Sequence, residues 1–98
     1  MTLTFNSIKK SIVPILESND INYAGLFGSY ARNEPTDDSD IDLLVSFSKP
    51  VSLLTVCRVE RNLSEVLQKK VDLVTKGALS PYIKPYIMKD LQIIYEKK

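Results

Sequence analysis

The sequence predicts an α+β fold, with one small mixed β-sheet and helices packed mainly on one of its faces. Short apolar runs typical of buried strands alternate with longer segments in which apolar residues recur at helical spacing. The resulting order is helix, strand, strand, helix, strand, helix, strand, which is typical of a small α+β sandwich. A chain of 98 residues, 44% of them hydrophobic, can bury one core but not two. We therefore expect residues 1–98 to form a single domain.

The first predicted helix begins at Phe5, because apolar residues follow at positions 8, 12, 15 and 16. Pro14 opposes a regular helix, since an interior proline removes a hydrogen bond and clashes with the preceding turn. We expect this helix to be kinked or interrupted near Val13 and to end in a turn at residues 18–20. Residues 23–27 predict a short buried strand that ends at Gly28, followed by one helical turn at 29–33 and a polar loop at 33–39.

The middle of the chain predicts a strand and a helix. Residues 40–47 alternate between Ile41, Leu43 and Val45 on one side and Asp40, Asp42 and Leu44 on the other. Pro50 and Ser52 can begin the next helix. Its expected apolar stripe, which places the single cysteine in the core, consists of Leu53, Val56/Cys57, Leu63 and Val66/Leu67.

The C-terminal third predicts a strand, a helix and an edge strand. Residues 71–74 form the strand, and Ser80 followed by Pro81 is a favourable helix start, although Pro85 disturbs the first turn. The last strand is expected at residues 92–95. Tyr82, Tyr86 and Ile87 provide the apolar side of the helix, which we expect to pack in the core or to form a partner interface.

Composition excludes several kinds of chemistry. The chain has no histidine, which rules out Ser-His-Asp and Cys-His catalysis and zinc sites built on histidine. A formal net charge of +1 gives no reason to expect direct nucleic-acid binding. The lone cysteine and the absence of an apolar run as long as a membrane span are typical of a cytoplasmic protein that does not bind membranes.

Asp40 and Asp42 are the first candidate site residues. On a strand, side chains at i and i+2 share a face, and their Cα atoms lie about 6.6 Å apart. Two carboxylates at that spacing repel each other unless a cation lies between them, and their oxygens are the ligands that Mg²⁺ prefers. The spacing also suits a pair of metal ions about 3.5–4 Å apart. The motif therefore predicts a magnesium site with two ions.

Three further features join this candidate site. Asp72 is the one charged residue in an apolar strand, where aspartate lowers stability unless it is paired or metal-bound. Gly28 and Ser29 end a strand and begin a turn, a place where backbone amides can bind phosphate. Arg32 lies close enough in sequence to reach the same phosphates. Taken singly, the aspartates are compatible with solvent-facing strand positions and Arg32 with an exposed surface residue.

Taken together, Gly28-Ser29, the Asp40-x-Asp42 pair after ten intervening residues and the isolated Asp72 resemble the polymerase-β-type nucleotidyltransferase signature. The sequences from Gly28 to Arg32 and from Asp38 to Leu43 are similar to those of the minimal nucleotidyltransferases, which are partners of HEPN-domain proteins in toxin–antitoxin pairs. Asn33 stands where the family often has glycine, a substitution that asparagine tolerates.

The resemblance implies a polymerase-β-like fold and a set of residue roles. It implies that Asp40 and Asp42 bind Mg²⁺, that Asp72 is a third metal-binding carboxylate that helps to activate a hydroxyl, and that Gly28 and Ser29 hold a nucleoside triphosphate. It further implies an antitoxin that transfers AMP from ATP to a tyrosine of a HEPN toxin. Two alternatives stay open at this point: an antitoxin that neutralises its toxin by binding alone, and a stand-alone transferase for a small hydroxyl compound.

Overall fold

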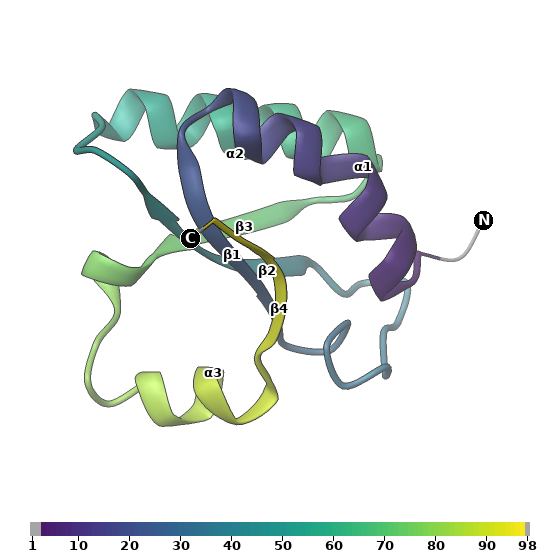
Figure 1. The fold of residues 1–98 in the computed structure, drawn as a ribbon. Coiled ribbons are helices and arrows are strands. Elements are labelled where there is room, and N and C mark those ends of the chain that lie inside the picture. The colour runs from purple at the N-terminus through teal and green to yellow at the C-terminus, as the bar shows by residue number, and fades with distance from the viewer. Residues whose placement is uncertain (1–2, 98) are drawn as a thin grey trace.

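The fold is the expected α+β arrangement, in a computed structural model that describes residues 3–97 (Figure 1). The order of elements agrees with the sequence prediction, with one short 3₁₀ turn added. The elements are α1 (Phe5–Ser18), β1 (Ile21–Phe27), β2 (Ile41–Phe47), α2 (Leu53–Leu67), β3 (Val71–Thr75), the 3₁₀ turn η1 (Lys76–Ala78), α3 (Lys84–Asp90) and β4 (Gln92–Glu96).

The four strands form one mixed sheet in the order β3-β2-β1-β4. β1 runs antiparallel to both β2 and β4. β4 lies at one edge of the sheet, as the sequence predicts. β2 and β3 are parallel, and α2 is the crossover connection between them. This connection places β3 beside β2, so residues about thirty positions apart in the chain become neighbours in the sheet.

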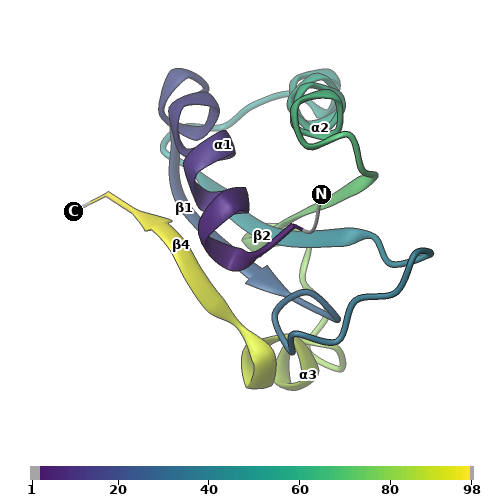
Figure 2. The same ribbon diagram turned by 90° about the vertical axis from the view of Figure 1, so that its right-hand side faces the viewer.

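Two helices cover one face of the sheet and the third lies on the other (Figure 2). α1 and α2 pack over the larger core, to which β2 contributes Ile41, Leu43 and Val45. α3 packs on the opposite face through Ile87, which meets Tyr23 and Leu44. Because side chains alternate along a strand, the even-numbered residues of β2 face the α3 side.

α1 is one continuous helix, so the expected interruption near Val13 is wrong. Thr4 caps the helix, with its hydroxyl accepting from the Ser7 amide while the Ser7 hydroxyl accepts from the Thr4 amide. Ile8, Ile12 and Leu16 are buried at four-residue intervals. Pro14 is exposed. Its missing hydrogen bond therefore falls on the solvent side, where water can bind the freed carbonyl.

α2 begins at the predicted Ser52 cap but turns a different side to the core. Val59, Leu63 and Leu67 are buried, whereas Leu53 and Val66 of the expected stripe are exposed. Cys57 is also exposed, which corrects its expected burial. At about 100° per residue, Cys57 lies about 200° around the helix from Val59 and so points away from the sheet.

α3 is shorter than the sequence predicts. Ser80 begins a turn, since its carbonyl accepts from the amides of Ile83 and Lys84, but regular helix starts only at Lys84. Pro85 has no amide to donate, which explains the late start. Ile87 is buried, while Tyr82 and Tyr86 are exposed, so the expected core role of the two tyrosines is wrong.

No helix within residues 3–97 has both the length and the apolar character that a membrane span requires.

Two leucines of α2 test this packing as a matched pair. Leu63 is fully buried, whereas Leu54 is 82% exposed on the same helix. Leu63→Ala leaves a cavity, so we expect it to lower the free energy of unfolding by about 2–4 kcal/mol. Leu54→Ala should change it by less than about 0.5 kcal/mol. Urea denaturation of both variants measures these values, and equal losses would contradict the orientation of α2.

Candidate active site

Asp42 and Asp72 lie side by side on neighbouring parallel strands. Asp42 is aligned with Asp72 of β3 on one side and with Phe27, the last residue of β1, on the other. Adjacent strands lie about 4.8 Å apart, and aligned side chains point to the same face. Asp40 immediately precedes β2 rather than lying within it. The structure thus brings together the two aspartates that the sequence places thirty residues apart.

The pKa of the Asp42 carboxyl group is raised by its surroundings. Partial burial, the nearby Asp72 and the nearby Asp40 together raise the pKa of Asp42 from its ordinary 3.8 to about 6, while Arg32 opposes this shift. The shift records an electrostatic conflict, since two like charges face Asp42 in a place with reduced access to water. A cation bound among these groups relieves that conflict.

Lys70 already provides positive charge beside two of the three aspartates. Its ammonium lies 3.8 Å from an oxygen of Asp40 and 4.0 Å from an oxygen of Asp72. Within residues 3–97, no three acidic side chains converge on one point as they stand. The donor types nevertheless fit Mg²⁺, because hard carboxylate oxygens are the ligands that it prefers. The Lys70 ammonium occupies the place of a cation beside Asp40 and Asp72.

The turn after β1 approaches Asp42 closely. Gly28 has φ of +77°, a left-handed conformation, and a Cβ atom at this position would collide with the Asp42 carboxylate. The amides of Ala31 and Arg32 both donate to the Gly28 carbonyl, which closes the helical turn expected here. Ser29 lies at the start of this turn, ahead of those bonded amides. Glycine is therefore required at position 28 for two independent reasons.

Arg32 is held between the turn and the C-terminal segment. Its guanidinium donates to Asp90 at the end of α3, at 3.0 Å, and lies 3.8 Å from Glu34. Close by, the Gln92 side chain donates to the Ala31 carbonyl at 2.7 Å. The Arg32 side chain is 46% exposed. Arg32 thus combines the expected exposure with a position near the acidic cluster.

Two residues of α2 that the sequence analysis did not connect with the site hold β3 on both sides of Asp72. The Glu60 carboxylate accepts from the Leu73 amide at 2.8 Å, and the Ser64 hydroxyl accepts from the Val71 amide at 3.0 Å. Glu60 and Ser64 are one helical turn apart and so lie on one side of α2. Their four-residue spacing was visible in the sequence, but only the crossover shows which strand they reach.

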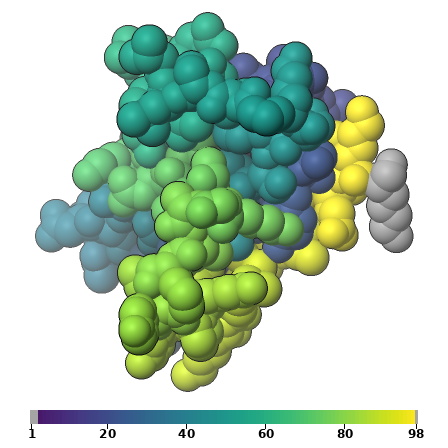
Figure 3. Space-filling model, turned by 90° about the vertical axis from the view of Figure 1, so that its left-hand side faces the viewer, coloured from purple at the N-terminus to yellow at the C-terminus, as the bar shows by residue number. Residues whose placement is uncertain are grey.

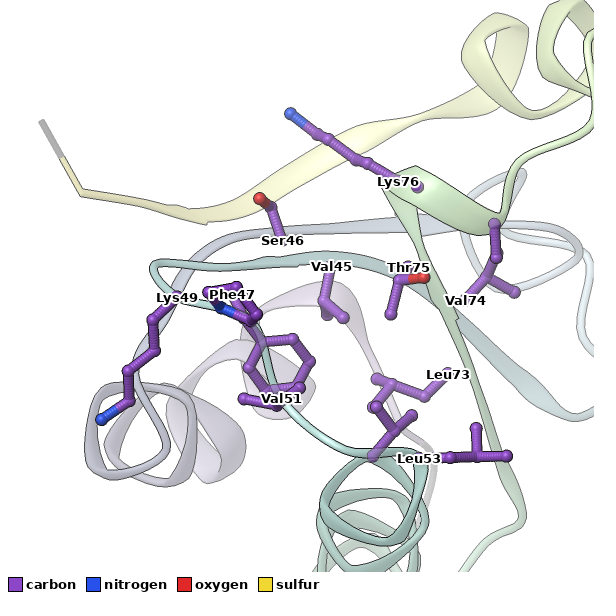
Figure 4. A pocket seen from close by; sticks show the side chains of 14 residues that line it. Val45, Ser46, Phe47, Lys49, Val51, Leu53, Leu73, Val74, Thr75 and Lys76 are labelled. Carbon is purple, nitrogen blue, oxygen red and sulfur yellow. The ribbon is translucent and has the colours of Figure 1, made fainter.

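Two neighbouring cavities open beside β3, and only one of them contains Asp42 and Asp72. The cavity beside Asp42 and Asp72 has a volume of about 430 Å³ and reaches α3 through Ile83 and Ile87. The other, of about 700 Å³, is larger but contains no carboxylate; Figure 4 shows its apolar wall with Phe47, Val51 and Leu53. Chemistry rather than size therefore identifies the smaller cavity as the candidate active site.

Residues 10–98 match the family described as polymerase beta, nucleotidyltransferase. The chain belongs to this family and is a nucleotidyltransferase, as the fold and the paired carboxylates lead one to expect. It is 43% identical, over 90% of its own length and 95% of the relative's, to a Methanocaldococcus jannaschii protein provisionally named a protein adenylyltransferase. It is also 40% identical, over 68% of each chain, to the protein adenylyltransferase MntA of Thermococcus cleftensis.

Solved structures share the fold at lower identity. A toxin–antitoxin structure with AMP-PNP superposes with a TM-score of 0.81 at 22% identity, over 92% of this chain and 74% of that one. A tri-AMPylated Shewanella oneidensis HEPN toxin in complex with an MNT antitoxin gives a TM-score of 0.76 at 20% identity, over 96% of this chain and 74% of that one. At these identities the likeness concerns the fold.

The raised pKa of Asp42 predicts a gain in stability on neutralisation. A carboxyl group whose folded pKa is raised contributes stability at low pH, and that contribution is lost as the pH rises from 3.8 through about 6. Asp42→Asn should therefore raise the free energy of unfolding at pH 7 by about 1 kcal/mol, after allowance for partial exposure, and much less at pH 4. Urea denaturation at the two pH values measures the difference.

Asp38→Asn is the matched control, because Asp38 lies exposed in the loop before β2. It should leave stability unchanged at both pH values. A loss of stability for Asp42→Asn at pH 7 would contradict the electrostatic conflict described above.

The Glu60 contact predicts a local effect on β3. Glu60→Ala leaves the Leu73 amide without its protein acceptor, so we expect a loss of about 1–2 kcal/mol in the free energy of unfolding. Hydrogen exchange at the Leu73 amide should accelerate at the same time. Glu65→Ala, which changes an exposed residue of the same helix, is the control. Unchanged exchange at Leu73 in Glu60→Ala would show that the hydrogen bond does not hold the strand.

Proposed function

We propose that this protein is a Mg²⁺-dependent protein adenylyltransferase that transfers AMP from ATP to a tyrosine of a partner HEPN-domain toxin and so acts as its antitoxin. In this proposal Asp40, Asp42 and Asp72 form the catalytic metal-binding set. Gly28 and Ser29 bind the triphosphate, and Arg32 assists them. The proposal places the enzyme in the cytoplasm, as a single nucleotidyltransferase domain that binds neither membranes nor nucleic acid directly.

The observation that carries the proposal is the alignment of Asp42 with Asp72 beside the Gly28 turn. Carboxylates crowded in this way destabilise an empty fold, which is expected where function requires them. The neighbouring turn begins with Ser29, whose amide and hydroxyl can donate to phosphate oxygens. The carboxylates for a metal and the donors for a phosphate thus lie at the same end of the sheet, where β1 ends and β2 begins.

The reaction is a displacement at the α-phosphorus of ATP. The acceptor oxygen forms a bond to this phosphorus, the bond from the phosphorus to the oxygen bridging to the β-phosphate breaks, and pyrophosphate leaves. Asp72 takes the proton of the acceptor hydroxyl and releases it to solvent, while the Ser29 amide and Arg32 stabilise negative charge on the phosphates. Bound Mg²⁺, held by the three aspartates, supplies Lewis-acid stabilisation of phosphate charge.

Three similarities support the choice of acceptor. Two relatives with at least 40% identity carry the name protein adenylyltransferase. One structure with the same fold is an antitoxin bound to a HEPN toxin that carries AMP groups, and another contains AMP-PNP.

The test is AMP transfer to a HEPN-domain protein encoded beside this chain, measured by intact mass after incubation with Mg²⁺ and ATP. Wild type should modify the partner, and Asp40→Asn/Asp42→Asn should lower the rate by about 10²-fold or more. Asp37→Asn changes an exposed loop acid and should retain full activity.

Transfer by the double variant at the wild-type rate would refute the assigned site. No transfer by wild type, despite a stable complex and measurable Mg²⁺–ATP affinity, would instead indicate another acceptor or neutralisation by binding alone.

A further inference from the structure

We propose that the cavity beside Asp42 and Asp72, together with the exposed side of α3, is the docking surface for the tyrosine-bearing segment of the partner. This inference rests on the proposed function and assigns the acceptor side of the reaction to particular residues. The inference follows from the acidic wall and the apolar wall of the cavity and from the exposed aromatic residues beside it.

One wall of the cavity is acidic and the other is apolar. Asp42, Asp72 and Glu60 line the acidic side. The apolar side comes from β1 and from the segment that leads into α3, and consists of Phe27, Leu79, Ile83 and Ile87. An occupant that matches both walls carries a hydroxyl group at one end and an apolar body at the other. A phenol, which is the side chain of tyrosine, has this arrangement.

The walls of the cavity discriminate between classes of acceptor. A sugar presents polar groups on all sides, and the apolar wall leaves those groups without hydrogen-bond partners. A neutral aromatic hydroxyl avoids this penalty, so complementarity favours tyrosine on a polypeptide.

The surface next to the cavity has the composition of a protein interface. Tyr82 is 86% exposed and Tyr86 is 76% exposed, and Ile83 is a third exposed large apolar residue. Figure 3 shows the segment with α3 (yellow-green) forming the lower part of one face of the molecule. Tyrosine is enriched at protein interfaces, and exposed apolar patches commonly mark them. The patch lies beside the cavity, so a segment bound there can place a side chain next to Asp72.

A second exposed apolar patch, formed by Leu53 and Leu54 at the start of α2, provides an internal control. α2 covers the opposite face of the sheet from α3 (Figure 2). Neither leucine lines the cavity that contains the aspartates. A partner segment docked on Leu53 and Leu54 therefore lies on the wrong side of the sheet for transfer.

The experiment compares Ile83→Gln with Leu54→Gln, two neutral replacements of exposed aliphatic residues. In AMP transfer to the partner toxin, Ile83→Gln should raise KM for the toxin at least fivefold and leave Mg²⁺–ATP affinity within twofold of wild type. Leu54→Gln should match wild type in both. A loss of ATP affinity in Ile83→Gln would assign the cavity to the nucleotide, and unchanged transfer would place the acceptor elsewhere; either result overturns the proposal.

A second measurement separates this inference from the proposed function. p-Cresol, which is the tyrosine side chain with a methyl group in place of the backbone, is titrated into labelled protein containing Mg²⁺ and a non-hydrolysable ATP analogue. Methyl signals of Leu79, Ile83 and Ile87 should shift, while those of Leu53 and Leu54 stay fixed. Shifts at these three residues without any AMP transfer to the toxin would refute the toxin as the acceptor but support the docking surface. Shifts centred on Leu53 and Leu54, or none, would refute the surface.

Discussion

The repulsion among Asp40, Asp42 and Asp72 is the constraint on which the rest of the site depends. The parallel pairing of β2 with β3 places Asp42 beside Asp72, and burial makes the resulting charge harder for water to screen. A fold selected for stability alone has no reason to keep three carboxylates there. In the proposed function, a cation and phosphate groups bind among these carboxylates and relieve their repulsion, which adds to the free energy of binding.

The surrounding structure holds these groups from three directions. Glu60 and Ser64 of α2 bind the outward amides of β3 on either side of Asp72. The absence of a side chain at Gly28 lets the turn at residues 28–33 lie against the Asp42 carboxylate. Arg32 joins that turn to α3 through Asp90. The proposed acceptor surface on α3 and the turn proposed to bind nucleotide are therefore joined by a side-chain contact.

The order of elements and the paired aspartates could be predicted from the sequence, because period-two and period-3.6 patterns report directly on strands and helices. The side of α2 that faces the core could not be predicted, because the sequence allows two overlapping apolar stripes and only the tertiary packing selects one of them. Burial of Val59 excludes Cys57 from the core. Proline had opposite effects at two sites: Pro14 is tolerated on an exposed helix face, while Pro85 delays α3. Glu60 required the tertiary structure, since its partner is a backbone amide thirteen residues away.

The most direct test of the account is the location of the divalent cation in solution. Mn²⁺ replaces Mg²⁺ in many carboxylate sites and broadens the NMR signals of nearby nuclei. With Mn²⁺ and ATP, the account predicts broadening of the amide signals of Gly28, Asp42 and Asp72, while those of Leu53 and Leu54 remain sharp. Broadening centred elsewhere, or none at saturating Mn²⁺–ATP, would contradict the claim that these aspartates exist to hold a metal and a nucleotide.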